Sequence, residues 1–182
     1  MIQHSDETGP APTKWTNLYK DLFLLQLAAL VFVTDQFTKF LVREFLEFRQ
    51  SFPDEGFIRL THTYNTGSAF GLFQGQNAPL ALVSIIGITI LVLIYRSQRR
   101  PSNLLRLSLG LQFGGAAGNL LDRVRMGHVT DFVDVGPWPI FNLADASIVV
   151  GVGLLAWIFW SRGGRWTGAG AGGADTREEI PT

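Results

Sequence analysis

Four long apolar stretches, separated by polar connectors, dominate the sequence. They cover about residues 18–40, 70–95, 104–121 and 141–160. The second is the plainest, because no charged residue occurs from Phe70 to Tyr95. Each stretch is close to the ~20 residues that a helix needs to cross the hydrocarbon core of a bilayer. The pattern therefore predicts an all-α membrane protein with four transmembrane helices.

The connector between the first two stretches has a different pattern. Residues Phe57–Tyr64 alternate in polarity and are rich in β-branched and aromatic side chains. This alternation is typical of a β-strand with one buried face. We therefore expect a small β-sheet element over about residues 43–68, resting on the membrane surface.

Positive charge predicts the orientation of the helices. The connector between the second and third stretches carries four arginines and no acidic residue: Arg96, Arg99, Arg100 and Arg106. Connectors rich in Lys and Arg usually remain on the cytoplasmic side. Four spans then place both termini in the cytoplasm, and the connectors over residues 41–69 and 122–140 face outward, near the outer leaflet.

The two ends of the chain lack the apolar pattern. Residues 1–17 are polar and aperiodic, and residues 166–182 include a run of glycine and alanine that cannot bury a core. We expect flexible cytoplasmic tails on either side of one transmembrane unit over residues 18–165. Leu22–Val33 has the length of a secretory signal core, but no small-x-small cleavage site follows it, which favours a retained span.

Composition removes several classes of function. Of the 182 residues, 47% are hydrophobic and only 16% charged, which favours a membrane protein over a soluble domain. The formal net charge is zero, so no basic field would attract nucleic acid. Cysteine is absent, and the three histidines form no HExxH pair, so we expect neither a thiol nucleophile nor a metal or other cofactor.

Carboxylates stand out at the edges of the apolar stretches: Asp35, Asp122, Asp131 and Asp145. A carboxylate at bilayer depth costs about 2.5–3.5 kcal/mol, so such residues usually have a function. Asp131 and Asp145 flank one short connector, which suggests that they act as a pair. Asp134, three residues after Asp131, is an alternative that spacing alone does not exclude.

A pair of aspartates has a definite chemistry. Two carboxylates about 3 Å apart in a medium of low dielectric repel each other, so together they hold one proton. The ionised member can take a proton from water, while the protonated member polarises a scissile carbonyl. This is the general acid–base chemistry of an aspartic protease.

The third apolar stretch combines a bare stripe with polar groups. Glycine recurs every four residues at Gly110, Gly114 and Gly118, a spacing that lets helix backbones approach closely in lipid. The stripe continues to Asp122, with Asn119 and Arg123 beside it. A close helix crossing would therefore bring a polar cluster into the interior of the bundle.

Other polar residues allow two readings each. Asp35 and Lys39 are spaced i,i+4, so they either form a simple ion pair or contribute to substrate binding. Asn142 is a natural N-cap for the fourth stretch, and Asp145 either completes that cap or takes part in catalysis.

The segment before the second stretch is also polar. Asn65 offers both a hydrogen-bond donor and an acceptor, and could contact a substrate backbone. Ser68 raises the possibility of a serine nucleophile. Its surroundings are not a GxSxG elbow, however, and no histidine has an evident orienting partner, so this alternative is the weaker one.

Five of these segments together resemble one family, the lipoprotein signal peptidases (signal peptidase II), which are membrane aspartic proteases. The matching segments, in the order of the family, are Thr34–Lys39, Tyr64–Phe70, Gly114–Arg123, Val129–Phe132 and Phe141–Ala146. Each motif alone is weak, but five in register across about residues 20–160 are highly specific.

The resemblance implies four transmembrane helices in a bacterial inner membrane, an extracytoplasmic β element and an active site near the outer leaflet. It implies hydrolysis of the peptide bond before the diacylglyceryl-modified cysteine of a prolipoprotein, with Asp131 and Asp145 as the catalytic pair. It also implies contact with membrane lipid, a monomer, and inhibition by globomycin. The residues expected to line or brace the site are Asp35, Lys39, Asn65, Gly118, Asn119, Asp122, Arg123 and Asn142.

Two other classes of protein compete with a protease. Acidic residues within a membrane also mark proton relays, so a small proton-coupled transporter or channel is the main alternative. Transporters often contain inverted repeats, and the sequence shows none. A structural assembly subunit would use the glycine stripe but would leave Asp131 and Asp145 unexplained.

Overall fold

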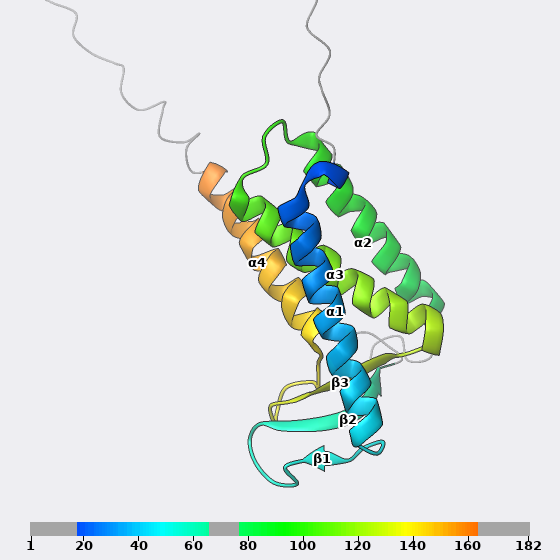
Figure 1. Cartoon of the computed structure of the whole chain (residues 1–182). Coiled ribbons are helices and arrows are strands. Elements are labelled where there is room, and N and C mark those ends of the chain that lie inside the picture. The colour runs from blue at the N-terminus through cyan, green and yellow to red at the C-terminus, as the bar shows by residue number, and fades with distance from the viewer. Residues whose placement is uncertain (1–17, 66–76, 164–182) are drawn as a thin grey trace, which may run out of the picture.

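The computed structural model describes residues 18–65 and 77–163. A short 3-10 turn, η1 (Leu18–Lys20), leads into four long helices, and three short strands lie at one end of them. Figure 1 shows the strands at the end of the molecule opposite the connector between α2 and α3. The helices are α1 (Leu22–Phe45), α2 (Asn77–Ser97), α3 (Asn103–Met126) and α4 (Leu143–Gly163).

Helix α3 is the central element of the bundle, because α1, α2 and α4 all pack against it. The glycine stripe makes this packing possible. A Cβ atom added at Gly114 would lie 2.6 Å from the carbonyl oxygen of Ala28 in α1. On the other side of α3, a Cβ at Gly115 would lie 2.5 Å from the carbonyl oxygen of Ala144 in α4. Glycine therefore lets α3 touch the backbones of two neighbouring helices.

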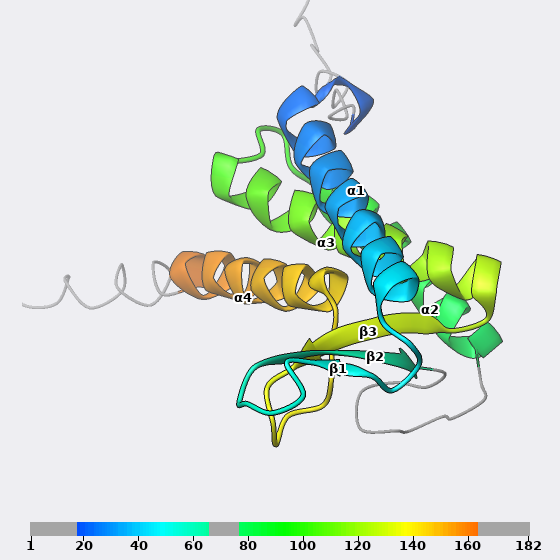
Figure 2. The same cartoon turned by 60° about the horizontal axis from the view of Figure 1, so that its bottom comes forward.

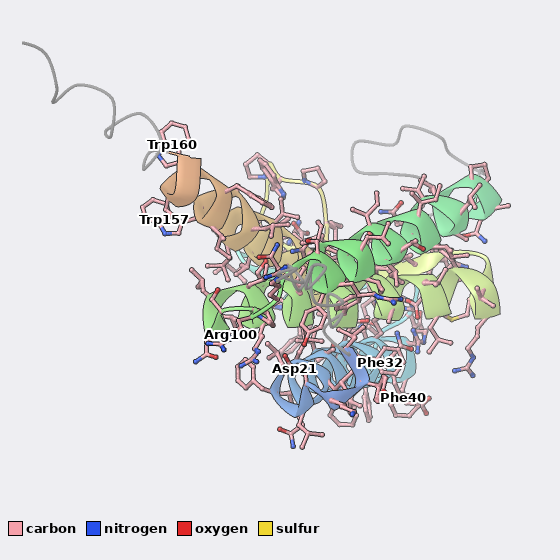
Figure 3. All side chains as sticks on the ribbon, turned by 90° about the horizontal axis from the view of Figure 1, so that it is seen from above. Asp21, Phe32, Phe40, Arg100, Trp157 and Trp160 are labelled. Atoms are coloured by element: carbon pink, nitrogen blue, oxygen red, sulfur yellow. The ribbon has the colours of Figure 1, made fainter. Side chains whose placement is uncertain are left out.

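Three helices are long and apolar enough to cross a membrane by length and composition: α1, α2 and α4, within the residues that the structure describes. Their outward surfaces carry many large apolar side chains, including Phe40, Val149, Trp157 and Trp160. Figure 3 shows Trp157 and Trp160 projecting away from the other helices. Such faces would be costly in water and are suited to lipid. Helix α3 falls outside this group, because glycine and polar residues make up much of it.

The helices extend beyond the apolar stretches in ways that local contacts explain. Helix α1 begins after Asp21, whose side chain accepts a hydrogen bond from the Leu24 N–H and caps the helix. It continues past Lys39 to Phe45, because the charge of Lys39 is paired inside the bundle. Helix α3 ends where Gly127 adopts a left-handed conformation, with φ of 76°.

The sheet is antiparallel in the order β1 (Ser51–Phe52), β2 (Arg59–Asn65) and β3 (Val129–Asp134). The strand in residues 57–64 is confirmed as β2. The expected start of the β element near residue 43 is wrong, because α1 occupies residues 43–45. The third strand was not predicted from the sequence, and Figure 2 shows it between β2 and the helices.

Candidate active site

Two connections bring Asp131 and Asp145 to the same place. Asp131 lies in the middle of β3, where it pairs with Thr63 of β2. After β3 the chain reverses, and Val133 and Phe141 exchange backbone hydrogen bonds of 2.7 and 3.1 Å. This return places Asn142 beside Asp131 and starts α4 at once. Asp145 therefore lies in the first turn of α4, next to the strand that carries Asp131.

Asn142 joins the two carboxylates. Its side-chain nitrogen donates to Asp131 Oδ1 at 2.6 Å, and its side-chain oxygen accepts from the Asp145 N–H at 2.9 Å. The Asn142 N–H in turn donates to Asp145 Oδ2 at 3.4 Å. The last two bonds form a reciprocal cap at the start of α4, so the predicted N-cap is present. A single buried amide thus fixes both aspartates relative to each other.

Amide groups also hold the outer oxygens of the pair. Asn65 Nδ2 donates to Asp131 Oδ2 at 2.9 Å, and Asn119 Nδ2 donates to Asp145 Oδ1 at 2.7 Å. Within the described residues, neither carboxylate takes part in an ion pair. Burial, and after it the nearby charge of Asp145, raises the pKa of Asp131 to about 7. Asp131 can therefore hold or release a proton near neutral pH.

The other two aspartates of the cluster are bound to a cation instead. Lys39 has no exposed surface, and its Nζ lies 2.9 Å from Asp35 Oδ2 and 3.2 Å from Asp122 Oδ2. The same Nζ donates to Asn119 Oδ1 at 2.9 Å, which turns the Asn119 amino group toward Asp145. The ion pair between Asp35 and Lys39, one of the two readings of their spacing, is present, and it is linked through Asn119 to Asp131 and Asp145.

Asp35 also connects the helices. Its Oδ1 accepts a hydrogen bond from the Ala144 N–H in the first turn of α4 at 3.0 Å. Gly118 faces it, and a Cβ at that position would collide with Asp35 Oδ2. Asp35 has no exposed surface, so its contacts are those of a bracing residue.

Asp134, the alternative to Asp131, lies in a different environment. Its carboxylate is bound by Arg59 at 2.6 Å and by Thr61 at 3.0 Å. Burial alone would raise the pKa of Asp134. The hydrogen bonds from Gly136, Thr61 and Arg59, together with the charge of Arg59, hold that pKa below its ordinary value. Asp134 is thus a fixed anion at the end of the sheet, away from Asn142 and Asp145.

Two residues of the cluster were missed in the sequence. Gln36 Nε2 donates to Asp122 Oδ1 at 3.1 Å and to the Gly118 carbonyl oxygen at 3.2 Å. The Thr130 N–H donates to Asp122 Oδ2 at 3.2 Å. Both residues lie directly next to a singled-out aspartate in the chain, which was the available signal. Ser68, the candidate nucleophile, lies outside the described residues.

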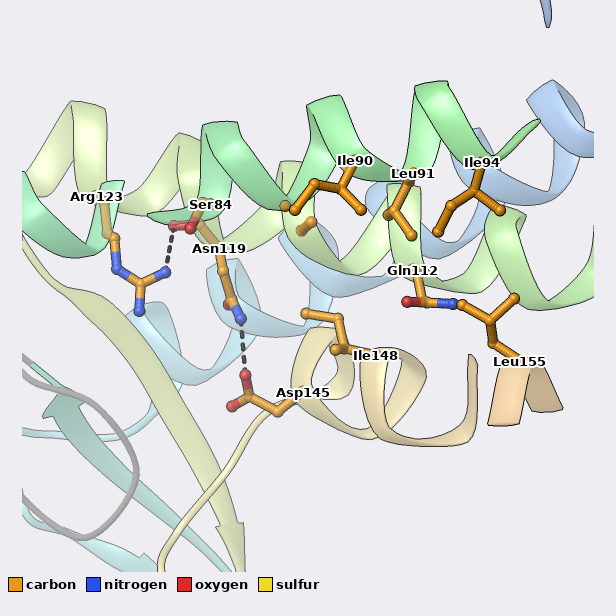
Figure 4. Close-up of a pocket in the computed structure, with 12 residues that line it drawn as sticks. Ser84, Ile90, Leu91, Ile94, Gln112, Asn119, Arg123, Asp145, Ile148 and Leu155 are labelled. Atoms are coloured by element: carbon orange, nitrogen blue, oxygen red, sulfur yellow. Dashed lines mark hydrogen bonds between the residues drawn. The ribbon is translucent and has the colours of Figure 1, made fainter. Parts of the chain in front are cut away.

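An open cavity of about 450 Å³ leads away from Asp145 between α2, α3 and α4. One end is polar and is lined by Ser84, Asn119, Arg123 and Asp145. Figure 4 shows Arg123 and Asp145 at this end, with the hydrogen bond from Asn119 to Asp145. The rest of the lining is largely apolar, so the cavity suits an apolar chain whose polar end meets the aspartates.

The fold and site define a membrane-type helical protein with paired carboxylates at the end of an apolar cavity. A family model described as "Signal peptidase (SPase) II" matches residues 27–161. The chain belongs to the signal peptidase II family.

Curated relatives and solved structures agree with this assignment. The lipoprotein signal peptidase of Moorella thermoacetica is 45% identical over 136 residues, which are 74% of this chain and 90% of that protein. The lipoprotein signal peptidase of Halothermothrix orenii is 40% identical over 134 residues, covering 73% and 92% of the two chains. A bacterial membrane enzyme structure solved at 2.3 Å is 27% identical, with a TM-score of 0.74, and covers 90% of this chain and 99% of its own.

Proposed function

We propose that this protein is a multi-pass bacterial membrane peptidase that removes signal peptides from prolipoproteins. Membership of the signal peptidase II family and the lipoprotein signal peptidases among its relatives support this activity. They also favour it over the transporter alternative. The single observation that carries the chemistry is the pair Asp131 and Asp145. One buried amide, that of Asn142, joins the two carboxylates, and among the described residues neither of them forms an ion pair.

The pair acts as an aspartic protease dyad. Asp131 is the main holder of the shared proton, because its pKa is raised to about 7. Its O–H donates to the carbonyl oxygen of the scissile bond, while Asp145 accepts a proton from the attacking water. The water oxygen bonds to the carbonyl carbon and forms a tetrahedral gem-diol. As this intermediate collapses, Asp145 gives its proton to the leaving nitrogen, and a hydroxyl group of the gem-diol returns a proton to Asp131. The carbon–nitrogen bond then breaks and the dyad returns to its starting state.

The bond that is cut precedes the diacylglyceryl-modified cysteine, as the family resemblance implies. The signal segment lies in the cavity between α2, α3 and α4, whose lining is mostly apolar. The lipid of the substrate remains in the outer leaflet, which confines the scissile bond at the depth of the aspartates. Confinement offsets much of the entropic cost of aligning the bond with the dyad.

All four helices cross the membrane in this proposal. Helix α3 is less apolar than the others, but its 24 residues are enough to span the bilayer. Four of its polar side chains are buried inside the bundle: Ser108, Gln112, Asn119 and Asp122. The arginine-rich connector after α2 lies at the end opposite the sheet (Figure 1). By the positive-inside rule that end and both termini are cytoplasmic, and the active site lies near the outer leaflet. The catalytic unit covers residues 18–165 and acts as a monomer in contact with lipid.

The function is tested with the purified full chain in detergent or lipid. A diacylglyceryl-modified prolipoprotein should be cut before its modified cysteine, and globomycin should inhibit the reaction. The same prolipoprotein without lipid should be cut much more slowly, because it lacks the anchor that positions the bond. Absence of cleavage of the lipidated substrate by folded protein would refute the proposed function.

A dependence on pH follows from the raised pKa of Asp131. Activity needs one proton on the pair, so kcat/KM should fall as pH rises through about 7, where Asp131 loses its proton. Asn65 donates to the ionised carboxylate and so lowers the pKa of Asp131. An Asn65→Leu variant should therefore shift the alkaline limb of the pH profile upward, by about one pH unit.

Asn77→Leu is the matched control for this shift. The Asn77 amide donates to a backbone oxygen, that of Arg123, and to neither carboxylate of the pair in the described structure. Its pH profile should keep the limb of the wild type. An unshifted limb in Asn65→Leu would show that Asn65 does not stabilise the ionised dyad.

A further inference from the structure

One polar side chain lies in the apolar part of the cavity, well away from the aspartates. Gln112 of α3 lines the cavity together with Ile90, Leu91, Ile94 and Leu155. It is 6% exposed. The proposed reaction gives this residue no role, and it lies outside the segments that carry the family resemblance.

The hydrogen bonds of Gln112 fix which way its amide points. Its Nε2 donates to the carbonyl oxygen of Ser108 at 3.3 Å and to Ser108 Oγ at 3.1 Å. Ser108 Oγ donates in turn to the carbonyl oxygen of Gly151 in α4 at 2.8 Å. A carbonyl oxygen can only accept, so the nitrogen of Gln112 must face Ser108 and its oxygen must point the other way. Figure 4 shows this oxygen directed away from Leu155.

The Gln112 side chain packs closely against α4 at Gly151. A Cβ added at Gly151 would lie 2.6 Å from Gln112 Cγ and 2.8 Å from the Ser108 carbonyl oxygen. Glycine at position 151 therefore lets α4 close against the Gln112 side chain and the Ser108 carbonyl group. Among the described residues, Gln112 Oε1 accepts no hydrogen bond. Leaving an amide oxygen without a hydrogen-bond donor in apolar surroundings costs free energy. A ligand with a donor group at the level of Gln112 along α3 therefore gains binding energy.

The distance to the dyad identifies the part of a substrate that would meet Gln112, on the basis of the proposed function. Residues 112 and 119 are seven apart on α3, which is about 10 Å along the helix axis. Asn119 contacts Asp145 and marks the catalytic end. A helical signal segment beside α3 would therefore present to Gln112 about the seventh residue before the cut. The backbone N–H groups of such a helix are used internally, so only a side chain can donate.

We propose that Gln112 is a specificity-determining residue that binds a serine or threonine hydroxyl in the signal segment, about five to nine residues before the scissile bond. The hydroxyl donates to Gln112 Oε1. The acyl chains of a lipid have no donor and cannot satisfy this oxygen. Gln112 thus selects for a small hydroxyl side chain at one residue position in an otherwise apolar signal segment.

The test uses lipidated prolipoproteins that carry one serine, moved position by position through an all-leucine signal segment. For the wild type, kcat/KM should be about three- to tenfold higher with serine than with leucine at one position in this window. Gln112→Leu and Gln112→Met both remove the acceptor, and each should abolish the preference. The readout is a ratio within one variant, so a general loss of activity does not affect it.

Ser84→Ala is the control variant. Ser84 also lines the cavity, but its hydroxyl donates to the Leu80 carbonyl of its own helix, so its ratio should match the wild type. Equal rates for serine and leucine at every position, or a preference that persists without Gln112, would overturn the inference. Failure of the wild type to cut any of the substrates would instead refute the proposed function.

Discussion

Replacing either Asp131 or Asp145 by asparagine is expected to abolish cleavage of a lipidated prolipoprotein, with a loss in kcat of about three to four orders of magnitude. Asparagine keeps the size of the side chain but can neither hold the shared proton nor take one from water. The oxygens of both aspartates accept hydrogen bonds from N–H groups, so the NH2 group of asparagine loses one of these bonds in each variant. The size of the side chain and the second bond are kept, so each variant should still fold, with reduced stability. Single-turnover cleavage of the lipidated substrate measures the effect.

Asp134→Asn is the matched control, because Asp134 lies on the same strand three residues after Asp131. Its carboxylate binds Arg59 and Thr61 at the end of the sheet, so its replacement should affect stability more than turnover. Thermal unfolding of all three variants in detergent separates folding from chemistry. A folded Asp131→Asn or Asp145→Asn variant with near-normal turnover would exclude the dyad.

The predicted parts of the site depend on local spacing. Asp35 and Lys39 are one helical turn apart, and the structure pairs them. The cap formed by Asn142 and Asp145 also lies within one turn. Contacts within one helical turn depend on only a few consecutive residues, so they can be predicted from a single sequence. Asn119 links the Asp35–Lys39 pair to Asp145. Helical spacing predicted that Asn119 belongs to a polar cluster, but it did not predict the contact with Asp145.

The unpredicted parts depend on contacts between distant segments. Strand β3 was missed because it is buried on both faces, so Val129–Asp134 does not alternate in polarity as β2 does. The polar character of α3 has a similar origin. Because α3 lies at the centre, several of its polar side chains, such as Gln112 and Asn119, face other helices. Hydropathy records the composition of a segment and not the direction in which its side chains point.

The four aspartates of the cluster, Asp35, Asp122, Asp131 and Asp145, fall into two pairs that have different bonding partners. Asp35 and Asp122 are both paired with Lys39 inside the bundle, away from water. Asp131 and Asp145 receive hydrogen bonds from amide groups, which carry no net charge to fix the protonation state. Arg123 lies near both of these carboxylates, and the charge of Lys39 lowers the pKa of Asp131, but burial outweighs this effect and the pKa of Asp131 is raised. Lys39 therefore forms ion pairs with Asp35 and Asp122 but with neither Asp131 nor Asp145.

Replacing Lys39 by methionine should destabilise the protein by about 3–5 kcal/mol, because it leaves two buried carboxylates without a cation. Denaturation of the purified protein by a strong detergent would measure the change in the free energy of unfolding. The variant should also lose activity at temperatures where it remains folded, since Lys39 fixes the amide of Asn119, which holds Asp145.

Two further variants show whether the loss arises from uncompensated charge. Arg59→Met breaks the pair with Asp134, in which Arg59 is 32% exposed. This variant should cost less, because it leaves one carboxylate instead of two without a cation, and Asp134 keeps hydrogen bonds from Thr61 and the Gly136 N–H. Adding Asp35→Asn and Asp122→Asn to Lys39→Met removes both buried charges and should restore a large part of the stability. If Lys39→Met were as stable as the wild type, Asp35 and Asp122 would be neutral in the folded protein. Lys39 would then not be what separates the two pairs of aspartates.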